Sequence, residues 1–568
     1  MCIISLAQSQ NTKKLHPNCN GGVLPLTQEE LDAIPILNIS PPSAQLSLPL
    51  KVDNSQLPYM PDIFEQKNGS CTQASTIQYT FSYEMNRLRG TSPQNNNYHN
   101  HFHHLSTFNH VKEPSSEHEG IYFARWTDGW NMAKEIGLPD YATYGNWDND
   151  ITYWMDGYDN CRSRGQYRVE DYYHITVHSN GDGLDDLKHW LHDHGNAENT
   201  GGLANLIMSG DIEYFQGTGE FAGETIISAT HTDCTFHAVT VVGYDDTFKQ
   251  DLNGDGLYTN DIDLNGDEEI DIKDWEKGAL KIVNSYGANW PEFSTDNHGN
   301  GYFYLPYRFI IQPKQIPTPD SLNKAQSFHI CKVKTEQLTD LGVKVQVISN
   351  DRRVPKVLFY YGENADDEMA FSDMPHSSNL YYNSPSTDSI NEVPMQGQNR
   401  SDTIELYFDF ATHFGDKDFG KIFTHVRKST YVPEESVKIG YFSLIDYRWG
   451  EEFEIYCDVR DYEIPSPPYT PNNFPTLSIN YDLLPFEINE DLTVRTDMIS
   501  RFSPTVHNGA TLKVDRETKI DMYNSELIIE PGATLFLGDN VVFTAKRGVS
   551  KIIVYGDLQL GNHVQFMA

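Results

Sequence analysis

The sequence predicts an α+β domain, followed by an antiparallel β-sandwich and a C-terminal stretch of parallel β-coils. The first prediction rests on apolar residues at helical spacing within residues 71–89 and on strand-like runs from about residue 235. The second rests on short alternating runs, separated by turn residues, after residue 322. The third rests on glycine-led segments that recur at similar intervals in residues 509–568.

Two helices and three strands are expected in the α+β domain. The run over residues 71–89 ends at Gly90, a helix terminator, and a second helix is expected over residues 130–136. The strands expected after residue 235 are residues 237–244, 279–285 and 301–307. The buried face expected for the first helix consists of Ile77, Phe81, Met85 and Leu88.

Short strands are expected throughout residues 322–464, which the proline-containing segment 313–321 links to the first domain. Turn residues separate alternating or aromatic runs here, as is typical of an antiparallel β-sandwich that serves as an accessory domain. The expected sandwich strands are residues 343–348, 356–361, 403–410, 437–445 and 452–459.

A repeat fills the C-terminal segment, residues 486–568. Gly509, Gly532 and Gly556 begin equivalent phrases that are 23 and 24 residues apart. Periods of this length with glycine at each corner predict stacked parallel β-coils. Because such a stack needs a cap over its last rung, we expect the native protein to continue beyond this segment, which would then be truncated.

Composition excludes several classes of function. The 568 residues exceed what one hydrophobic core accommodates, so several domains are expected. Lys and Arg total 42 against 80 Asp and Glu, and a formal charge of −38 argues against nucleic-acid binding, which needs a basic face. No run of about 18 apolar residues occurs, so no membrane span is expected. Seven cysteines without a C-x-x-C pair predict neither a zinc site nor a dense disulfide scaffold.

The N-terminal residues 1–19 resemble the remnant of an export signal. An apolar stub is followed by a small-residue cleavage pattern, although the basic stretch that usually precedes it is missing. We therefore expect a secreted or cell-surface protein, with a frayed polar terminus as the alternative. Residues 20–60 are rich in Pro, Leu and Ser and are expected to form a leader or an extended strap.

Three residues that are far apart in the sequence suggest nucleophilic chemistry. Cys71 begins the first predicted helix, where the helix dipole favours a thiolate. His237 opens a predicted strand, which holds an imidazole rigidly. Asn284 follows another strand and offers an amide that would fix the imidazole tautomer. A Cys–His–Asn set of this kind performs acyl transfer.

These residues and their surroundings resemble the papain-like cysteine peptidases, and among them a secreted bacterial member with several domains. The resemblance covers residues 45–312 and rests on the motifs NGSC, HAVTVVGY and NSYGANW. It implies a papain-like domain over residues 61–312, with a helical left part and a β-rich right part that flank the active site. It also implies that Cys71 is the nucleophile, His237 its base and later acid, and Asn284 the residue that orients the base.

The resemblance implies three further site residues. The family's oxyanion glutamine lies six residues before the nucleophile, where this sequence has Glu65, and Gln66 lies one residue closer. Because a carboxylate would repel the developing negative charge, Gln66 is the expected donor beside the Cys71 amide. Tyr286 stands where the family has a tryptophan over the Asn–His bond. Gly129 is expected along the cleft, paired with the substrate backbone.

An acidic insertion, residues 245–278, separates two predicted strands and carries twelve Asp or Glu against three Lys. Two D-x-N-x-D phrases in it place oxygen ligands at positions 1, 3 and 5 of a loop, as Ca²⁺ requires. The second phrase resembles an EF-hand or dockerin loop, except that Glu268 occupies position 6, where glycine is preferred. A solvated acidic loop is the alternative. The predicted ligands of structural Ca²⁺ are Asp251, Asn253, Asp255, Asp263, Asn265, Asp267, Asp271 and Asp274.

The sequence therefore predicts a secreted papain-like cysteine endopeptidase that hydrolyses proteins or peptides and is stabilised by calcium, without an organic cofactor. Its two C-terminal β-domains are candidates for binding a cell surface or a polymer. Two alternatives remain open: an inactive papain-like domain in an adhesion or polymer-binding protein, and a transamidating enzyme on the same triad. The histidines between residues 99 and 110 match no metal-ligand spacing and are expected in an exposed loop.

Overall fold

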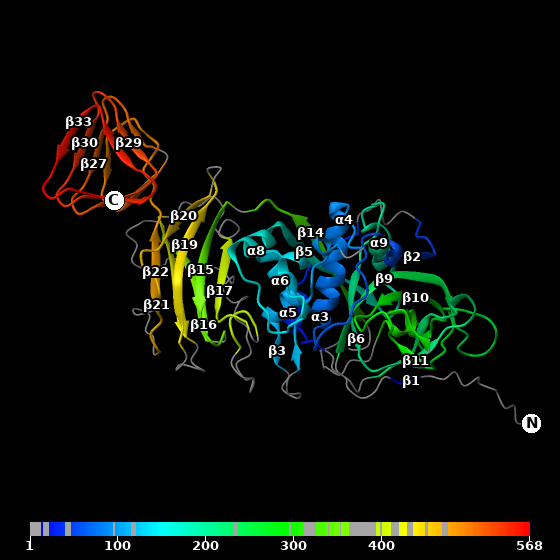
Figure 1. Ribbon diagram of the computed structural model, residues 1–568. Helices are drawn as coiled ribbons and strands as arrows, with labels where there is room; N and C mark the ends of the chain where they lie inside the picture. Colours follow the sequence, from blue (N-terminus) through cyan, green and yellow to red (C-terminus); the bar gives the residue numbers. More distant parts are fainter. Residues whose placement is uncertain are drawn as a thin grey trace, which may run out of the picture. The chain divides into compact units, whose positions relative to one another are not determined.

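The computed structural model confirms an α+β arrangement, antiparallel sheets beyond it, and a C-terminal parallel β-coil (Figure 1). None of the helices in the described residues is long and apolar enough to cross a membrane. The structure describes residues 13–14, 22–39, 47–94, 97–114, 121–231, 236–294, 297–311, 325–338, 340–352, 354–362, 393–397, 400–409, 420–428, 436–448, 452–467, 475–501 and 503–568. Most of the predicted signal remnant and the predicted linker 313–321 therefore lie outside the described residues.

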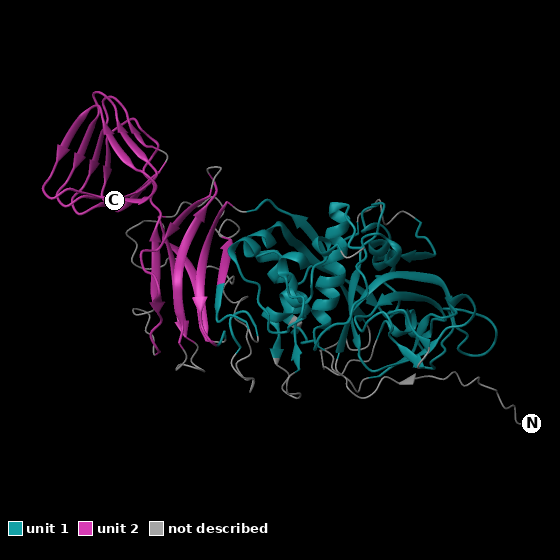
Figure 2. Ribbon diagram, in the orientation of Figure 1, with its two compact units in different colours: residues 1–338, 351–353, 379–404 teal, residues 339–350, 354–378, 405–568 magenta. Residues whose placement is uncertain are grey.

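Two compact units divide the chain (Figure 2). The first comprises residues 1–338, 351–353 and 379–404, and the second comprises residues 339–350, 354–378 and 405–568. The predicted catalytic residues and the acidic insertion all belong to the first unit, whereas the β-coil belongs to the second.

The predicted helix over residues 71–89 is present and ends at Gly90, whose φ of 63° is left-handed. It consists of α3 (Cys71–Gln73), a π-helical stretch η2 (Ala74–Phe81) and α4 (Ser82–Arg89). Ile77, Phe81 and Met85 are fully buried, as expected. Leu88 is 47% exposed instead, because it lies in the last turn, beyond the covered part of the helix.

The first unit contains further helices. The predicted helix at residues 130–136 starts earlier, as α6 (Trp126–Glu135), and buries Trp126 and Trp130. The remaining helices are α1 (Gln28–Asp32), α5 (Leu105–Val111), α7 (Tyr141–Tyr144), α8 (Tyr158–Ser163) and α9 (Leu184–Asp193). Short 3-10 turns are η1 (Asn54–Gln56), η3 (Tyr98–Asn100), η4 (Arg164–Gln166), η5 (Gly219–Phe221), η6 (Ile272–Asp274) and η7 (Tyr307–Phe309).

A ten-stranded sheet forms the other half of the first unit, in the order β1-β7-β8-β13-β10-β9-β6-β14-β5, with β2 beside β9. The three strands predicted after residue 235 are β9 (Phe236–Lys249), β10 (Lys277–Val283) and β13 (Tyr302–Pro306). The others are β1 (Lys13–Lys14), β2 (Lys51–Asp53), β5 (Tyr167–His178), β6 (Ala204–Ser209), β7 (Ile212–Gln216), β8 (Thr225–Thr230) and β14 (Ala325–Thr335). Two small pairs are β3 (Glu113–Pro114) with β4 (Tyr122–Phe123), and β11 (Glu292–Ser294) with β12 (Asn297–His298).

Two antiparallel sheets form the predicted β-sandwich, with orders β17-β15-β19-β20 and β16-β18-β22. Phe359 of one sheet contacts Phe408 of the other, with ring centroids 4.4 Å apart, so the sheets pack face to face. The strands are β15 (Leu341–Ile348), β16 (Pro355–Gly362), β17 (Thr403–Asp409), β18 (Lys421–Lys428), β19 (Lys438–Asp446), β20 (Phe453–Tyr456), β21 (Tyr462–Glu463, beside β19) and β22 (Thr476–Asn480).

Three four-stranded parallel sheets form the predicted β-coil. Equivalent residues stack in register, so Leu512 and Leu535 are fully buried, whereas Leu558 on the last rung is 45% exposed. The three sheets are β23 (Glu487–Ile488), β26 (Thr505–Val506), β29 (Glu526–Ile529), β32 (Lys551–Val554); β24 (Leu492–Val494), β27 (Thr511–Val514), β30 (Thr534–Leu537), β33 (Asp557–Leu560); and β25 (Met498–Ser500), β28 (Lys519–Tyr523), β31 (Val542–Arg547), β34 (Gln565–Met567).

His103, His104 and His110 of the histidine-rich run are buried, contrary to the expectation of an exposed loop, whereas His99 is exposed. His103 and His104 stack on each other, with ring centroids 4.5 Å apart. His103 Nε2 lies 3.0 Å from Asn149 Oδ1, and His104 Nδ1 lies 2.5 Å from Gln78 Oε1. Polar neighbours inside the fold therefore replace the solvent that the sequence pattern suggested.

Acid is expected to destabilise the first unit through His103. Burial lowers the pKa of His103 to about 4 from its ordinary 6.5, although the Asn149 side chain raises it. The unfolded chain therefore binds this proton more readily. The free energy of unfolding should fall by about 3 kcal/mol as the pH decreases from 6.5 to 4, and this term should be constant above pH 6.5.

Urea unfolding at a series of pH values measures this effect. The variant His103→Asn should flatten the pH dependence, whereas the control His178→Asn, at an exposed side chain at the end of β5, should leave it unchanged. Identical pH profiles for His103→Asn and the parent would contradict the assignment.

Candidate active site

Asn284 holds the His237 imidazole. His237 lies at the start of β9 and Asn284 follows β10, and these two strands are paired with Val241 opposite Ile282. The distance between His237 Nε2 and Asn284 Oδ1 is 2.9 Å. The Ser285 amide also donates to Asn284 Oδ1, at 2.7 Å, so this oxygen is the acceptor and Nε2 carries the proton. Nδ1 is left as the basic nitrogen.

Tyr286 covers one face of this imidazole. Its ring is stacked on His237 with centroids 4.7 Å apart and an interplanar angle of 16°. The phenol oxygen is 3.4 Å from Nδ1. Because the rings are nearly parallel, the hydroxyl lies over the ring and not along the in-plane lone pair of Nδ1. That lone pair therefore stays free to accept a proton in the ring plane.

Cys71 is the first residue of α3 and is fully buried. Its side chain packs with Val23 and with Ala238, the residue after His237. The Gly22 amide donates a hydrogen bond to the Cys71 sulfur at 3.3 Å. Within the described residues, no hydrogen bond joins the thiol to His237. The Cys71 thiol thus lies beside the strand that carries His237, but a backbone segment covers it.

Burial keeps both groups neutral in this conformation. It raises the pKa of the Cys71 thiol, and hydrogen bonds from the backbone at Ala238 and Gly22 act in the opposite direction. Burial also lowers the pKa of His237 to about 4, against the raising effect of the Asn284 side chain. The helix dipole was expected to favour a thiolate at Cys71, but desolvation outweighs it here.

The covering segment is Gly22–Leu24, from the stretch predicted to be a leader or strap. It runs parallel to Ala124: the Leu24 amide donates to the Ala124 carbonyl, and the Ala124 amide donates to the Gly22 carbonyl, both at 3.0 Å. A Cβ on Gly22 would lie only 1.5 Å from the carbonyl oxygen of Gly69. Only glycine fits at this close approach to the residues before Cys71.

Gln66 is buried, whereas Glu65, at the family's usual offset, is exposed. The Ser285 hydroxyl donates to Gln66 Oε1 at 2.6 Å, and Gln66 Nε2 donates to the Asn68 carbonyl at 3.1 Å. These two bonds orient the amide with its NH₂ group toward the loop that leads to Cys71. One hydrogen of that group is left for another acceptor.

Gly129, predicted to pair with the substrate backbone, lies within α6, where its backbone belongs to the helix. A Cβ there would be 1.9 Å from Gln73 Oε1. Ala124 instead presents the backbone that pairs with Gly22–Leu24. Sequence reasoning missed Gly22, Ala124 and Ser285, and the only signal for them was the adjacent pair Gly21–Gly22, which permits close backbone approach.

The two acidic phrases of the insertion have the same local geometry. Asp251 accepts hydrogen bonds from the amides three and five residues later, at 2.6 and 2.9 Å, and Asp263 does the same at 2.7 and 3.0 Å. Glu268 adopts φ 68°, the left-handed conformation for which its loop position prefers glycine. Asp271 pairs with Lys273, whereas the buried Asp274 accepts backbone amides. The remaining predicted ligands, in the turns of the same loops, are Asn253, Asp255, Asn265 and Asp267.

No group of three or more His, Cys, Asp or Glu side chains arranged to hold a metal ion is found in the described part of the chain. The carboxylates of the insertion are instead engaged with the backbone amides of their own loops. Their chemistry is that of Ca²⁺ ligands, and calcium binding stays a prediction.

Comparisons with known proteins give matches of fold. No protein-family model matches the chain, and no curated protein is similar to it in sequence. Xylellain, a cysteine protease from Xylella fastidiosa, has 16% identity and a TM-score of 0.36, covering 56% of this chain and 97% of its own. Procathepsin B from Trypanosoma congolense has 13% identity and a TM-score of 0.32, covering 56% and 87%. Procathepsin L 3 from Tenebrio molitor has 13% identity and a TM-score of 0.31, covering 55% and 76%.

Displacement of Gly22–Leu24 is expected to expose the Cys71 thiol. In the variant Gly22→Val the new side chain would collide with the Gly69 carbonyl, so the segment must leave the site. Alkylation of Cys71 by iodoacetamide, followed by peptide mass spectrometry, should become at least about tenfold faster. Pro25→Val, at an exposed position of the same segment, is the control. Equal rates for Gly22→Val and the parent would show that the segment does not protect the thiol.

Calcium is expected to raise the melting temperature. A ligand present at a hundredfold excess over its Kd stabilises the folded state by about 2.7 kcal/mol. Differential scanning fluorimetry with 1 mM Ca²⁺ (about this excess for a site with a Kd of about 10 μM) or with EGTA tests this. Asp263→Asn should reduce the shift, and Glu220→Gln, an exposed acid outside the loops, should retain it. The same melting temperature with and without Ca²⁺ would exclude the site.

Proposed function

We propose that the chain is a papain-like cysteine endopeptidase that acts on proteins or peptides through Cys71, His237 and Asn284. The observation that carries the proposal is the 2.9 Å bond between His237 Nε2 and Asn284 Oδ1, beside a helix-terminal cysteine that packs against Ala238. The bond fixes the tautomer that leaves Nδ1 basic, which a thiol nucleophile requires of its partner.

The proposed reaction uses these groups in sequence. His237 Nδ1 takes the proton of the Cys71 thiol, and the sulfur attacks the peptide carbonyl. The Cys71 amide and the free hydrogen of Gln66 Nε2 stabilise the oxyanion. His237 then gives its proton to the leaving amine, which departs and leaves a thioester. Water, deprotonated by His237, hydrolyses the thioester and restores the thiol.

We further propose that the described conformation is latent. Gly22–Leu24 occupies the space over the Cys71 sulfur, and both the thiol and the imidazole are neutral and desolvated. Removal of this segment would admit water, raise the imidazole pKa toward its ordinary range and lower that of the thiol. A bound substrate would then find the backbone of Ala124 free to pair with its own.

Structural calcium in the insertion, export to the cell surface or medium, and a bacterial origin complete the proposal. The acidic insertion lies between β9 and β10, so bound Ca²⁺ would support the pairing on which the His237–Asn284 bond depends. The resemblance of residues 1–19 to a signal remnant supports export.

Peptide cleavage tests the proposed activity. The variant Gly22→Val, with Ca²⁺ and a reductant, should cut a mixed peptide library, and Gly22→Val with Cys71→Ala should be inactive, with a loss of at least about 10³-fold, because only Cys71 supplies the nucleophile. The matched control is Gly22→Val with Cys161→Ala, a buried cysteine in α8.

Three outcomes separate the alternatives. Cuts that disappear only with Cys71→Ala support the peptidase. Incorporation of a labelled amine without net cleavage would indicate transamidation instead. If Gly22→Val cuts no peptide although its Cys71 thiol is alkylated quickly, the domain is catalytically inactive.

A further inference from the structure

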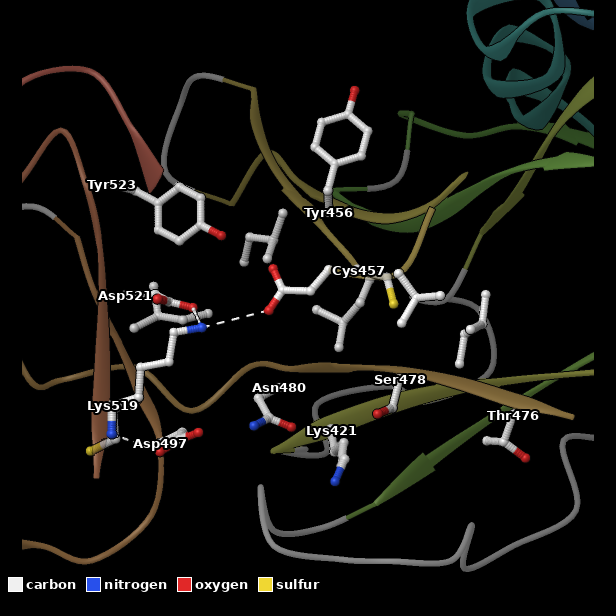
Figure 3. Close-up of a pocket in the computed structure, with 17 residues that line it drawn as sticks. Lys421, Tyr456, Cys457, Thr476, Ser478, Asn480, Asp497, Lys519, Asp521 and Tyr523 are labelled. Carbon is white, nitrogen blue, oxygen red and sulfur yellow. Dashed lines mark hydrogen bonds and ion pairs between the residues drawn. The ribbon is translucent and has the colours of Figure 1, made fainter. Parts of the chain in front are cut away.

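A polar cavity of about 360 Å³ lies in the second unit, whereas the candidate active site belongs to the first (Figure 3). Its walls come from β18 and β22 of the sandwich, from the chain that follows β20, and from β25 and β28 of the coil. The volume is within the range of small-molecule sites. Its lining is more polar than apolar, so it does not suit an apolar ligand.

Ion pairs and an aromatic contact hold the two sides of the cavity together. Asp458, on the sandwich side, forms ion pairs with Lys519 at 3.6 Å and with Lys546 at 2.6 Å, both from the coil. Phe453 packs edge-on against Tyr523, with ring centroids 5.2 Å apart. The cavity is therefore a built feature, with walls fixed by charge pairing and by aromatic contact.

One wall presents a row of hydrogen-bonding side chains. Thr476, Ser478 and Asn480 alternate along β22, so their side chains share a face, and all three line the cavity (Figure 3). Lys421 lies opposite Asn480 in the register of β18 and β22. Within the described residues, no side chain forms a hydrogen bond with the Asn480 amide or the Ser478 hydroxyl, and the Lys421 amine lies over the Phe423 ring, 5.4 Å from its centroid.

The opposite wall adds acceptors and a donor. Lys519 is already neutralised by Asp521 at 3.1 Å and by Asp458, so it adds no net positive charge. The exposed Asp497 uses one oxygen to accept the Lys519 amide at 2.7 Å, and its other oxygen faces solvent. Burial raises the pKa of the Tyr523 phenol, whose hydroxyl therefore stays a donor.

This combination matches a neutral, hydroxyl-rich molecule. Lys421 and Lys519 are balanced by three carboxylates, so neither a strong anion nor a cation is favoured. The hydroxyls of such a molecule donate hydrogen bonds to carboxylates and accept them from amides and amines. They can therefore use both the acceptors and the donors that line the cavity.

We propose that this cavity binds a saccharide, as the end or a segment of a neutral polysaccharide. Donors from β18 and β22 and acceptors from the coil would each bind ring hydroxyls of the same sugar unit. Such a site would tether the chain to a carbohydrate polymer. It is independent of the proposed peptidase activity, since it lies in the other compact unit.

Isothermal titration calorimetry on the full chain tests the proposal. The full-length Cys71→Ala variant would be titrated with cellohexaose, xylohexaose, mannohexaose, laminarihexaose and chitohexaose. We expect at least one hexaose to bind, and Asn480→Ala and Lys421→Ala each to weaken that binding about tenfold, as the loss of one or two hydrogen bonds would. Lys513→Ala, on the coil outside the cavity, is the matched control.

Each outcome of the titrations either supports or overturns the saccharide site. The site is supported if Asn480→Ala weakens hexaose binding while the circular dichroism spectrum stays unchanged. Absence of binding by all five hexaoses, or equal Kd values for Asn480→Ala and the parent, would overturn it. Tight binding of casein peptides at the same residues, without hexaose binding, would overturn it in favour of a peptide exosite. Because Cys71 is absent throughout, none of these results depends on peptidase activity.

Discussion

The pairing of β9 with β10 is the constraint on which the candidate active site depends. These strands bring His237 and Asn284, 47 residues apart, within one hydrogen bond of each other. The Ser285 amide, immediately after the strand, fixes the Asn284 side chain, and the Ser285 hydroxyl fixes Gln66. The ends of these two neighbouring strands therefore set the imidazole tautomer. They also orient the Gln66 amide, which is proposed to stabilise the oxyanion.

Desolvation decides the chemical state of this site. A helix N-terminus favours a thiolate by roughly 0.3–1 kcal/mol at exposed positions, whereas complete burial opposes ionisation far more strongly. Here burial prevails at both Cys71 and His237, because Gly22–Leu24 excludes water from the thiol. The same backbone segment that completes the packing thus also suppresses the proposed reactivity.

The sequence predicted the helices, strands and coils whose residues recur at regular spacing. The helix from Cys71 to Gly90, β9 and the parallel coil follow from spacings of apolar residues and glycines. The sequence did not predict that Gly22–Leu24 covers Cys71, because a single close contact between Gly22 and Gly69 leaves no periodic pattern. The buried histidines were also missed, because their nitrogens find partners such as Asn149 and Gln78 far along the chain, which no local pattern shows.

The contact between Gly22 and Cys71 is intramolecular, separated by 49 residues of the same chain. A tethered group of this kind acts at an effective concentration that is set by the chain and not by the amount of protein. Dilution therefore leaves the fraction of covered thiol unchanged, and a competing peptide must match a local concentration in the millimolar range or above. Uncovering the site is a first-order event within each molecule, so its rate is the same in dilute and in concentrated solutions of the protein.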